Sequence, residues 1–532
     1  MGLTRRDMLK MSVLAGGAIA LPLERTGHAL TAPTNHMASS ALPLPFTVPF
    51  AKPSVLAPVR SGLDPRTNGM TDYYRITMKP FIADVLPGFK TPMWGYNGEV
   101  PGPTLKATRG RPTVVRHINS LPATHPVLKY TPWTSVHLHG SPSLPQYDGY
   151  ASDITNPGQY KDYVYPNTQP GRTLWYHDHG VHHTAENISM GLEGQYHLID
   201  PAEQSLPLPR GDYDIPLTVM DTMFNADGSL LVTTHDDSGM FGDVILVNGR
   251  PWPFMQVKKR KYRFRILNGS VSRSYKWSLD SGDPMTVIAT DGGLVPFPQP
   301  VLSFRHGMGE RYDVVIDFAK YQTGQRIVLR NSSPKNNQNY ANTDKVMAFD
   351  VVDDAFDPAN NSIPAALNPT SPVMNLTEAQ SIITRPSHLD RGHGLWQIDG
   401  GTWDDVVRSN FTFIAANPNA GDVEIWEIHN DHGGWFHPAH IHLVDFQIIS
   451  RNGRPPMAHE RGPKDVAYIG ENEVVRVLMR FEGRGKYMIH CHNLVHEDHD
   501  MMTQYEVFDR TSKLPAPDPL GTPAKWLPEM AL

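Results

Sequence analysis

The only cysteine of the chain lies in a segment whose other residues also bind metals. Cys491 stands between His490 and His492, and His496 and Met501 follow it closely. A thiolate, an imidazole and a weak axial thioether, with one more imidazole from elsewhere in the chain, are the ligands of a blue-copper electron-transfer site. We therefore predict that Cys491, His496 and Met501 help to hold one copper ion.

The same segment can also serve a second metal centre. Successive side chains of a β-strand point to opposite faces, so Cys491 would face one way while His490 and His492 face the other. The peptide between the two centres would then be a short covalent path for electrons. The alternative interpretation of this segment is a histidine-rich surface loop.

Three further histidine pairs have the same spacing as His490 and His492. Residues i and i+2 of a strand share a face, so each pair can point at one site. Chance would place only roughly one such pair in a chain of this composition. Eight imidazoles are too many for one metal ion but suit a cluster of three, each with an open position for a small ligand. The other pairs are His137 and His139, His177 and His179, and His440 and His442, the last preceded by His437.

An internal repeat predicts the elements that position these pairs. Each unit is a turn followed, about 20–30 residues later, by an alternating strand that ends in Asn. Three copies predict three similar β domains, and the absence of a long amphipathic helical pattern favours β-sandwiches. The turns are Tyr96-Asn97-Gly98, Val247-Asn248-Gly249 and Ile398-Asp399-Gly400, and the strands end at Asn119, Asn268 and Asn430.

Turn-rich segments from Asp200 to Asp214 and from Asp353 to Pro372 divide the 532 residues between the units. We expect domains at 59–205, 206–360 and 361–532, preceded by a Pro-rich, extended lead-in at 30–58. The histidine pairs fall in the first and third domains, and the second is expected to be a copper-free spacer.

The N-terminus is expected to be a signal peptide covering residues 1–29. Thr4-Arg5-Arg6-Asp7-Met8-Leu9-Lys10 resembles a twin-arginine export motif, with Met8 where Phe is usual. The apolar run from Met11 to Leu23 is too short to span a bilayer, and small residues offer cleavage after Ala29. The sequence thus predicts export by the twin-arginine machinery to the periplasm or the extracellular space, with no membrane anchor after signal removal. The alternative is a basic tail.

Composition supports a globular, strand-rich protein. Pro and Gly, at 48 and 43 residues, suit many short strands joined by turns. The formal net charge of −6 and the lack of a basic run give no case for a nucleic-acid partner. One cysteine allows no internal disulfide, and an odd cysteine in an exported protein is a hazard or a ligand.

The stretches HLHG, HDH, HPAHIH and HCHNLVHEDHDMM, in this order, resemble the four copper-binding motifs of the multicopper oxidases. The similarity covers essentially the whole chain after the leader. Within the family, YHDHGVHHTAEN, GDVILVNGRPWPF and NTDKVMAFDV look most like the bilirubin oxidases, with spore-coat laccases as more distant relatives. The resemblance implies three cupredoxin-like Greek-key β-sandwich domains and an oxidase.

The resemblance also implies a set of ligands for four copper ions, and no ligand position departs from the family pattern. The blue type 1 copper would take His437, Cys491, His496 and Met501. The type 2 copper would take His137 and His440. One type 3 ion would take His139, His177 and His492, and the other His179, His442 and His490.

The implied reaction couples one-electron oxidation of a phenolic, tetrapyrrole or similar organic donor to four-electron reduction of dioxygen to water. Protons must reach the cluster, and Asp148 and Glu497 match acidic positions that the family uses as proton relays. The alternatives are a turn residue for Asp148 and a solvated charge for Glu497. Trp435, two residues before His437, is either part of the electron-entry surface or a core aromatic.

Two other functions remain open from sequence alone. A copper-free cupredoxin-fold protein acting in cell division or assembly can share this architecture and export route, but it would be expected to have lost ligands. An oxidase of cuprous, ferrous or manganous ions would keep them. The methionine-rich insert usual in cuprous oxidases is missing, because Met374 is the only methionine between Ala355 and Gly400.

Overall fold

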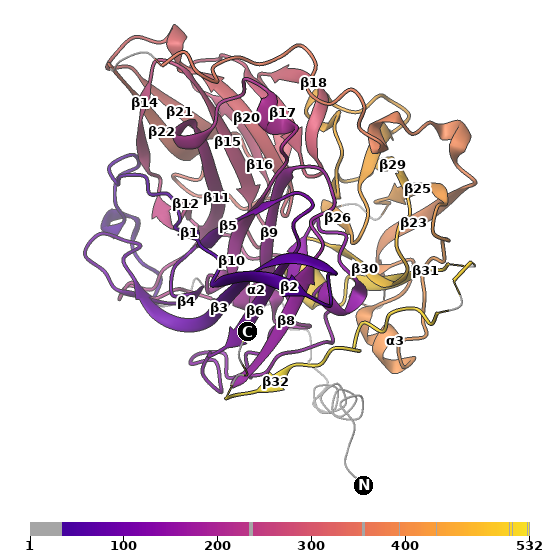
Figure 1. The fold of residues 1–532 in the computed structure, drawn as a ribbon. Helices are drawn as coiled ribbons and strands as arrows, with labels where there is room; N and C mark the ends of the chain where they lie inside the picture. The colour runs from indigo at the N-terminus through magenta and orange to yellow at the C-terminus, as the bar shows by residue number, and fades with distance from the viewer. Residues whose placement is uncertain are drawn as a thin grey trace.

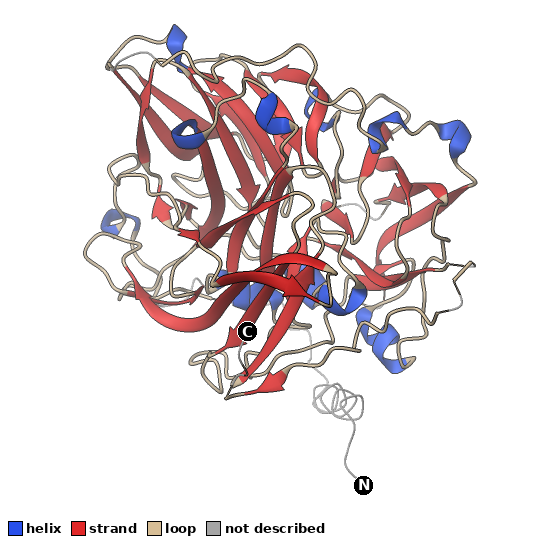
Figure 2. Ribbon diagram, in the orientation of Figure 1, coloured by secondary structure: helices blue, strands red, loops and turns tan. Residues whose placement is uncertain are grey.

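The computed structural model describes residues 35–232, 238–353, 357–392, 394–431, 434–509, 511–512, 514–528, 530 and 532. Strands dominate these residues (Figure 2), which confirms the predicted all-β class of cupredoxin-like sandwiches. The expected signal peptide at 1–29 lies outside the described residues. In the part of the chain that is described, no helix is long and apolar enough to cross a membrane. The α-helices described are short: α2 (Thr184–Ser189), α3 (Trp403–Arg408) and α4 (Leu494–Asp498).

The first sandwich pairs two sheets. One has the order β1-β5-β10-β9-β7: β1 (Val55–Leu56), β5 (Gly102–Thr108), β10 (Glu193–Ile199), β9 (Arg172–Asp178) and β7 (Val136–His139). The other has the order β2-β3-β6-β8-β32, with β4 beside β3: β2 (Arg60–Asp64), β3 (Gly69–Ala83), β6 (Thr113–Asn119), β8 (Gln159–Tyr165), β32 (Lys525–Trp526) and β4 (Thr91–Tyr96). The C-terminal strand β32 therefore returns to the first sandwich.

The second sandwich carries none of the histidine pairs. Its larger sheet has the order β13-β12-β11-β15-β20-β17-β18: β13 (Arg250–Pro251), β12 (Val244–Val247), β11 (Asp214–Thr222), β15 (Lys261–Asn268), β20 (Arg311–Asp317), β17 (Met285–Thr290) and β18 (Gly293–Val301). Its smaller sheet has the order β14-β22-β21-β16-β19: β14 (Phe254–Lys258), β22 (Lys345–Val352), β21 (Arg326–Asn331), β16 (Tyr275–Leu279) and β19 (Ser303–His306).

The third sandwich contains the cysteine segment. One sheet has the order β24-β23-β25-β29-β27: β24 (Leu395–Ile398), β23 (Ile383–Gly392), β25 (Val423–His429), β29 (Val474–Arg480) and β27 (Phe446–Arg451). The other has the order β28-β26-β30-β31: β28 (Val466–Ile469), β26 (His437–Ile441), β30 (Gly485–Cys491) and β31 (Met502–Val507).

The repeated turn has the same backbone conformation in all three sandwiches. Both central residues have positive φ, which favours Asn or Asp followed by Gly and matches the twist of a hairpin. The φ pairs are 59° and 81° at Asn97-Gly98, 50° and 73° at Asn248-Gly249, and 55° and 72° at Asp399-Gly400.

The asparagine that ends each repeated strand ties loops together through its side-chain amide. Asn119 Nδ2 donates to the carbonyls of Pro132 and Thr155. Asn430 Nδ2 donates to the carbonyls of Trp435 and Gly470, over 2.8 and 3.0 Å. The repeat is therefore a structural device, and in the third sandwich it anchors the loop that leads into His437.

The hydrophobic cores determine how the sandwiches are joined. One continuous core runs through the first and second sandwiches, and a separate one fills the third. The lead-in contains a short 3-10 helix, Ser39–Ala41, and then lies along the second sandwich, where Phe46 N and Phe50 N donate to the carbonyls of Trp252 and Phe254. Its Met37 is 2% exposed and belongs to the first core.

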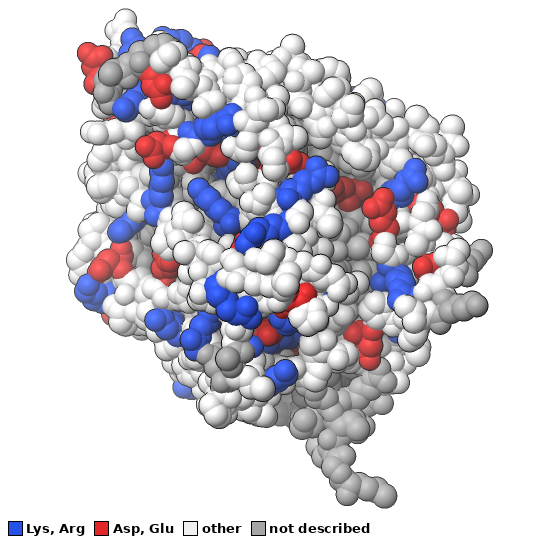
Figure 3. Space-filling model, in the orientation of Figure 1, with Lys and Arg blue, Asp and Glu red and all other residues white. Residues whose placement is uncertain are grey.

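The first and third sandwiches meet where β7 and β9 face β26 and β30, near the centre of Figure 1. Lys and Arg are interspersed with Asp and Glu on the surface that Figure 3 shows.

Candidate metal centres

Two pairs of antiparallel strands carry the histidine pairs. In the first sandwich His137 of β7 lies opposite His177 of β9, and in the third His440 of β26 lies opposite His490 of β30. Directly opposite residues of antiparallel strands project from the same face of the sheet. Each strand pair therefore presents its histidines as one set. The second member of three pairs, at 179, 442 and 492, comes just after its strand ends.

The structure brings all eight paired histidines together where these sandwiches meet. Each is at most 1% exposed. The His139 and His440 rings stack with centroids 3.7 Å apart, and His137 and His442 lie 4.0 Å apart. Ligand nitrogens lie within 4.8 Å of one another in the groups His137–His139–His177, His137–His440–His442 and His179–His442–His490.

Hydrogen bonds set which nitrogen of each imidazole is free to bind a metal. A main-chain carbonyl can only accept, so a ring nitrogen bonded to one carries the proton and the other nitrogen keeps its lone pair. The free Nε2 atoms of His137, His177 and His440 are buried without a hydrogen-bond partner among the described residues. Their Nδ1 atoms donate to the carbonyls of Asp148, Asp178 and Asp465, over 2.5, 2.7 and 2.8 Å.

Two further imidazoles of the cluster, those of His442 and His490, point their Nε2 atoms at each other. His442 Nδ1 lies 2.8 Å from Asp148 Oδ2, and His490 Nδ1 lies 2.9 Å from Glu497 Oε2. The opposite nitrogens, His442 Nε2 and His490 Nε2, are 3.1 Å apart. With both protons on the outer nitrogens, the two Nε2 atoms are acceptors without a donor between them, which is unfavourable unless a cation binds there. The cluster thus fits a group of metal ions with nitrogen ligands.

Cys491 lies on the reverse face of β30, as strand alternation predicts. Its Sγ is 3.4 Å from His437 Nδ1 and 3.6 Å from His496 Nδ1, and the two Nδ1 atoms are 3.2 Å apart. His496 Nε2 lies 3.1 Å from the carbonyl of Ser238 and 3.0 Å from Asn493 Nδ2. With the proton on Nε2, where the carbonyl can accept it, Nδ1 keeps the lone pair. Burial raises the pKa of the Cys491 thiol, so a thiolate here requires a bound cation.

The remaining candidate ligand, Met501, packs in the same part of the third sandwich as Cys491. Its side chain is completely buried in the hydrophobic core that contains Cys491. The main chain joins the two residues, because Cys491 N donates to the Met501 carbonyl over 3.1 Å. Burial also lowers the pKa of His437 to about 3, so this imidazole is neutral and can act as a ligand. The donor set of one thiol, two neutral imidazoles and a buried thioether fits copper.

Asp148 and Glu497 both contact the histidine cluster. Asp148 follows a short 3-10 helix, Pro145–Tyr147, and lies in a turn with Gly149, but its side chain is buried, with the residue 2% exposed. It touches one histidine from each strand pair, through its carbonyl to His137 and its carboxylate to His442. Burial raises the pKa of the Asp148 carboxyl. Glu497 in α4 is 3% exposed, so it is not a solvated charge, and its Oε1 lies 3.5 Å from His179 Nδ1.

Trp435 is half-buried against the third core, with its ring edge-on to His496 at 6.0 Å. Trp396, which the sequence analysis did not single out, is closer: it stacks on His496 at 4.1 Å and meets His437 edge-on at 5.2 Å. In the sequence, Trp396 stands two residues before the Ile398-Asp399-Gly400 turn. Nothing in that pattern indicates a contact with a metal ligand.

Asp465 is a second residue that contacts the candidate ligands and that the sequence pattern did not indicate. Its Oδ1 lies 3.0 Å from His139 Nε2, its carbonyl accepts from His440 Nδ1, and its carboxylate pairs with Arg311 of the second sandwich at 2.6 Å. In the sequence it follows Lys464 and would be interpreted as half of a surface ion pair.

Family comparisons agree with this geometry. Three family models, each described as multicopper oxidase, match residues 81–203, 175–350 and 388–510. The chain belongs to the multicopper oxidase family. It is a copper-dependent oxidoreductase that uses dioxygen, and not the copper-free assembly factor that the sequence left open. The bilirubin oxidase of Albifimbria verrucaria is 43% identical over 86% of this chain and 81% of its own length. The laccase of Bacillus subtilis is 33% identical over 88% of this chain and 98% of its own length.

Solved structures of other multicopper oxidases share the fold. The laccase of Pediococcus acidilactici has a TM-score of 0.76 and 30% identity, covering 88% of this chain and 95% of that one. The McoA multicopper oxidase of Aquifex aeolicus has a TM-score of 0.74 and 29% identity, covering 86% of this chain and 100% of that one.

Proposed function

We propose that this oxidase holds four copper ions in two separate centres and oxidises organic donors. The observation that carries the proposal is the set of buried, unprotonated imidazole nitrogens that converge between the first and third sandwiches, with a thiol on the back of the same strand. His437, Cys491, His496 and Met501 would hold one ion. The other eight histidines would hold three: His137 and His440 one, His139, His177 and His492 the second, and His179, His442 and His490 the third.

Bound copper would supply one-electron acceptance at the cysteine centre and four-electron reduction of dioxygen to water at the histidine cluster. The protein contributes by fixing the orientation and tautomer of the histidine ligands before metal binds. Carbonyls of Asp148, Asp178 and Asp465 hold three imidazoles in the tautomer that binds metal through Nε2. Because these carbonyls belong to buried backbone, the histidines do not need to reorient when metal binds.

Asp148 and Glu497 would hold and pass the protons that dioxygen reduction consumes. Each carboxylate contacts cluster histidines, and each lies on a different side: Asp148 near His137 and His442, Glu497 near His179 and His490. A buried carboxylate in reach of the reacting oxygen atoms can alternate between acid and base.

For the donor, we propose phenolic or tetrapyrrole-like organic molecules. The support is the similarity over most of the chain to a bilirubin oxidase and to laccases. Trp435 would form part of the electron-entry surface, because its indole lies edge-on to His496 and is only partly buried.

We also propose export by a twin-arginine signal at residues 1–29, supported by Arg5 and Arg6 ahead of an apolar run. Changing both arginines to lysine should leave the protein in the cytoplasm of a producing cell, as measured by fractionation. Normal export of that variant would refute the twin-arginine route.

Metal analysis of copper-loaded protein tests the central proposal. It should find four copper ions per chain, together with an intense visible band from the cysteine centre. Fully loaded, active protein with one or two ions would refute the cluster. A panel of phenols, bilirubin, and cuprous, ferrous and manganous ions then tests the donor class, and faster oxidation of a metal ion than of every organic donor would refute it.

A further inference from the structure

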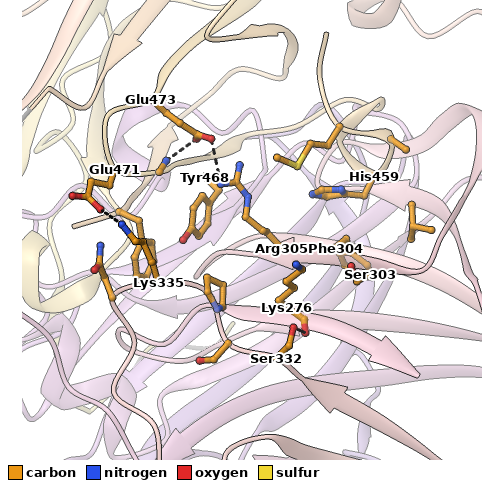
Figure 4. Close-up of a pocket in the computed structure, with 18 residues that line it drawn as sticks. Lys276, Ser303, Phe304, Arg305, Ser332, Lys335, His459, Tyr468, Glu471 and Glu473 are labelled. Carbon is orange, nitrogen blue, oxygen red and sulfur yellow. Dashed lines mark hydrogen bonds and ion pairs between the residues drawn. The ribbon is translucent and has the colours of Figure 1, made fainter. Parts of the chain in front are cut away.

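A cavity of about 820 Å³ opens between the second and third sandwiches (Figure 4). The second sandwich contributes β16 and β19, with Lys276 and Arg305, and the loop around Asn336. The third contributes His459 and Tyr468. This volume suits a small organic molecule, and cavities at domain interfaces are common ligand sites.

The walls of this cavity carry buried hydrogen-bonding groups without protein partners. Among the described residues, Arg305 Nε and Nη2, Asn336 Nδ2, Ser333 Oγ and His459 Nε2 are shielded from solvent and have no hydrogen-bond partner. The carboxylate oxygen Glu460 Oε1 is 4.0 Å from His459 Nε2, which is too far for a hydrogen bond. His459 is only 3% exposed. Leaving such groups unpaired costs free energy, so a ligand or water must satisfy them. Most of these atoms carry N–H or O–H groups that donate, which favours an oxyanion as the ligand.

The charges of the cavity favour an anion as well. Both acidic residues in its wall are already paired: Glu471 with Lys335 at 3.0 Å, and Glu473 with Arg305 Nη1 at 3.3 Å and with Arg451 at 2.9 Å. Glu473 therefore occupies only one edge of the Arg305 guanidinium. The other edge, Nε and Nη2, is the pair that binds a carboxylate in two parallel hydrogen bonds.

A column of stacked groups leads from this cavity to the cysteine centre. The Arg305 guanidinium lies 4.4 Å above the Tyr468 ring. Tyr468 stacks on Phe436, with centroids 4.9 Å apart and planes 4° from parallel. Phe436 precedes His437 in the chain, and Tyr468 pairs in register with Pro438. The cavity thus reaches one residue from a proposed copper ligand.

We propose that this cavity binds the organic electron donor through an anionic oxygen group, a carboxylate or a sulfonate. The oxyanion lies against Arg305 Nε and Nη2 and Asn336 Nδ2, and the aromatic body of the donor lies beside Tyr468. The inference rests on the proposed oxidase function. A phenolic donor releases one electron to the cysteine centre and its hydroxyl proton to solvent. Four such oxidations supply the four electrons that, with four protons, convert one dioxygen to two waters.

A matched pair of donors tests the site on the copper-loaded enzyme. Syringate and methyl syringate carry the same oxidisable phenol and differ in the anionic group. The ratio of kcat/KM for syringate to that for methyl syringate should fall about tenfold or more in Arg305→Gln, since a charge-assisted contact is lost. Asn336→Asp, a loop change that puts a carboxylate against the anion, should lower the ratio too. Arg326→Gln, which breaks the exposed ion pair between Arg326 of β21 and Asp350 of β22, is the control and should leave kcat/KM for both donors unchanged.

Calorimetry adds a readout that needs no turnover. The non-oxidisable 3,4,5-trimethoxybenzoate should bind the wild-type enzyme and the Arg326→Gln control, and should not bind Arg305→Gln. An unchanged donor ratio, or undiminished binding of trimethoxybenzoate to Arg305→Gln, overturns the proposed site. A wild-type enzyme that oxidises neither donor contradicts the proposed function instead, and calorimetry still decides whether the cavity binds the anion.

Discussion

His177-Asp178-His179 and His490-Cys491-His492 are two versions of one arrangement. The first two residues of each triplet end a buried strand, β9 or β30, and the first histidine of each lies opposite a histidine of the neighbouring strand. The residue between the histidines lies on the reverse face in both. Asp178 accepts hydrogen bonds there from Ser135 N at 2.8 Å and Asn187 Nδ2 at 2.7 Å, whereas Cys491 meets two imidazoles.

The same strand geometry gathers half of the histidine cluster in either sandwich. The groups on the reverse face of the strand decide what the residue between the histidines contacts. Asp178 anchors the loops around the cluster. Cys491 would connect the histidine cluster to the proposed copper site of His437, Cys491, His496 and Met501 through the peptide bonds to its neighbours His490 and His492. Among the described residues, the reverse face of the first sandwich places amide donors beside Asp178, whereas that of the third places His437 and His496 beside Cys491.

Cys491→Ser should have the largest effect of the substitutions in these two triplets. A hydroxyl at this buried position does not replace the thiolate, so the visible band and all oxidase activity should disappear while the protein stays folded. Metal analysis should find three copper ions instead of four. An intact visible band in this variant would exclude Cys491 as the ligand.

Asp148→Asn should slow proton delivery to the histidine cluster, which the two strand pairs form together. The amide oxygen can still accept from His442 Nδ1, but the side chain can no longer exchange a proton, so turnover should fall on the order of 10²-fold. Copper content and anaerobic reduction of the visible band by donor should stay nearly normal in stopped-flow measurements, with slow reoxidation by dioxygen. Slow reduction followed by normal reoxidation would place Asp148 on the donor side.

Asp178→Asn should lower the stability of the protein, because Asp178 anchors loops of the first sandwich. One carboxylate oxygen accepts from Ser135 N and Gly180 N, and the other accepts from Asn187 Nδ2. An amide group in place of the second oxygen would oppose another donor, so the free energy of unfolding should fall by about 1–3 kcal/mol. Denaturant unfolding measures the loss. Loss of the visible band at normal stability would show that Asp178 acts on the cysteine centre instead.

Met501→Leu should have the smallest effect and should reach only the cysteine centre. Leucine nearly matches the volume of methionine, so the core should tolerate it. Removing the weak thioether ligand, which stabilises oxidised copper, should raise the potential of this centre in a redox titration. Met502→Leu is the control, because the next side chain packs in a different hydrophobic cluster with Trp403 and should leave the potential unchanged. A lower or unchanged potential in Met501→Leu would mean that another residue is axial.

The amino-acid sequence by itself determined which side chains form the candidate centres. Spacing of two on a strand puts both histidines of a pair on one face, and the same alternation sends Cys491 to the other; both are local rules that need no tertiary contact. The Asn-Gly and Asp-Gly turns are local in the same sense, because positive φ at two successive residues restricts the amino acids that fit. The sequence therefore predicted the repeat, the β class and the facing of the cysteine segment.

Only the tertiary structure decided which residues hold the candidate ligands in place and where a donor molecule can approach them. Asp465 reaches His139, and Trp396 stacks on His496, across distances in sequence that no local pattern spans. The tautomer of His440 depends on a carbonyl 25 residues away. The donor cavity exists because Arg305 of the second sandwich packs on Tyr468 of the third. Such contacts depend on how the sandwiches dock, and docking buries whole faces at once, so no single segment of the chain encodes it.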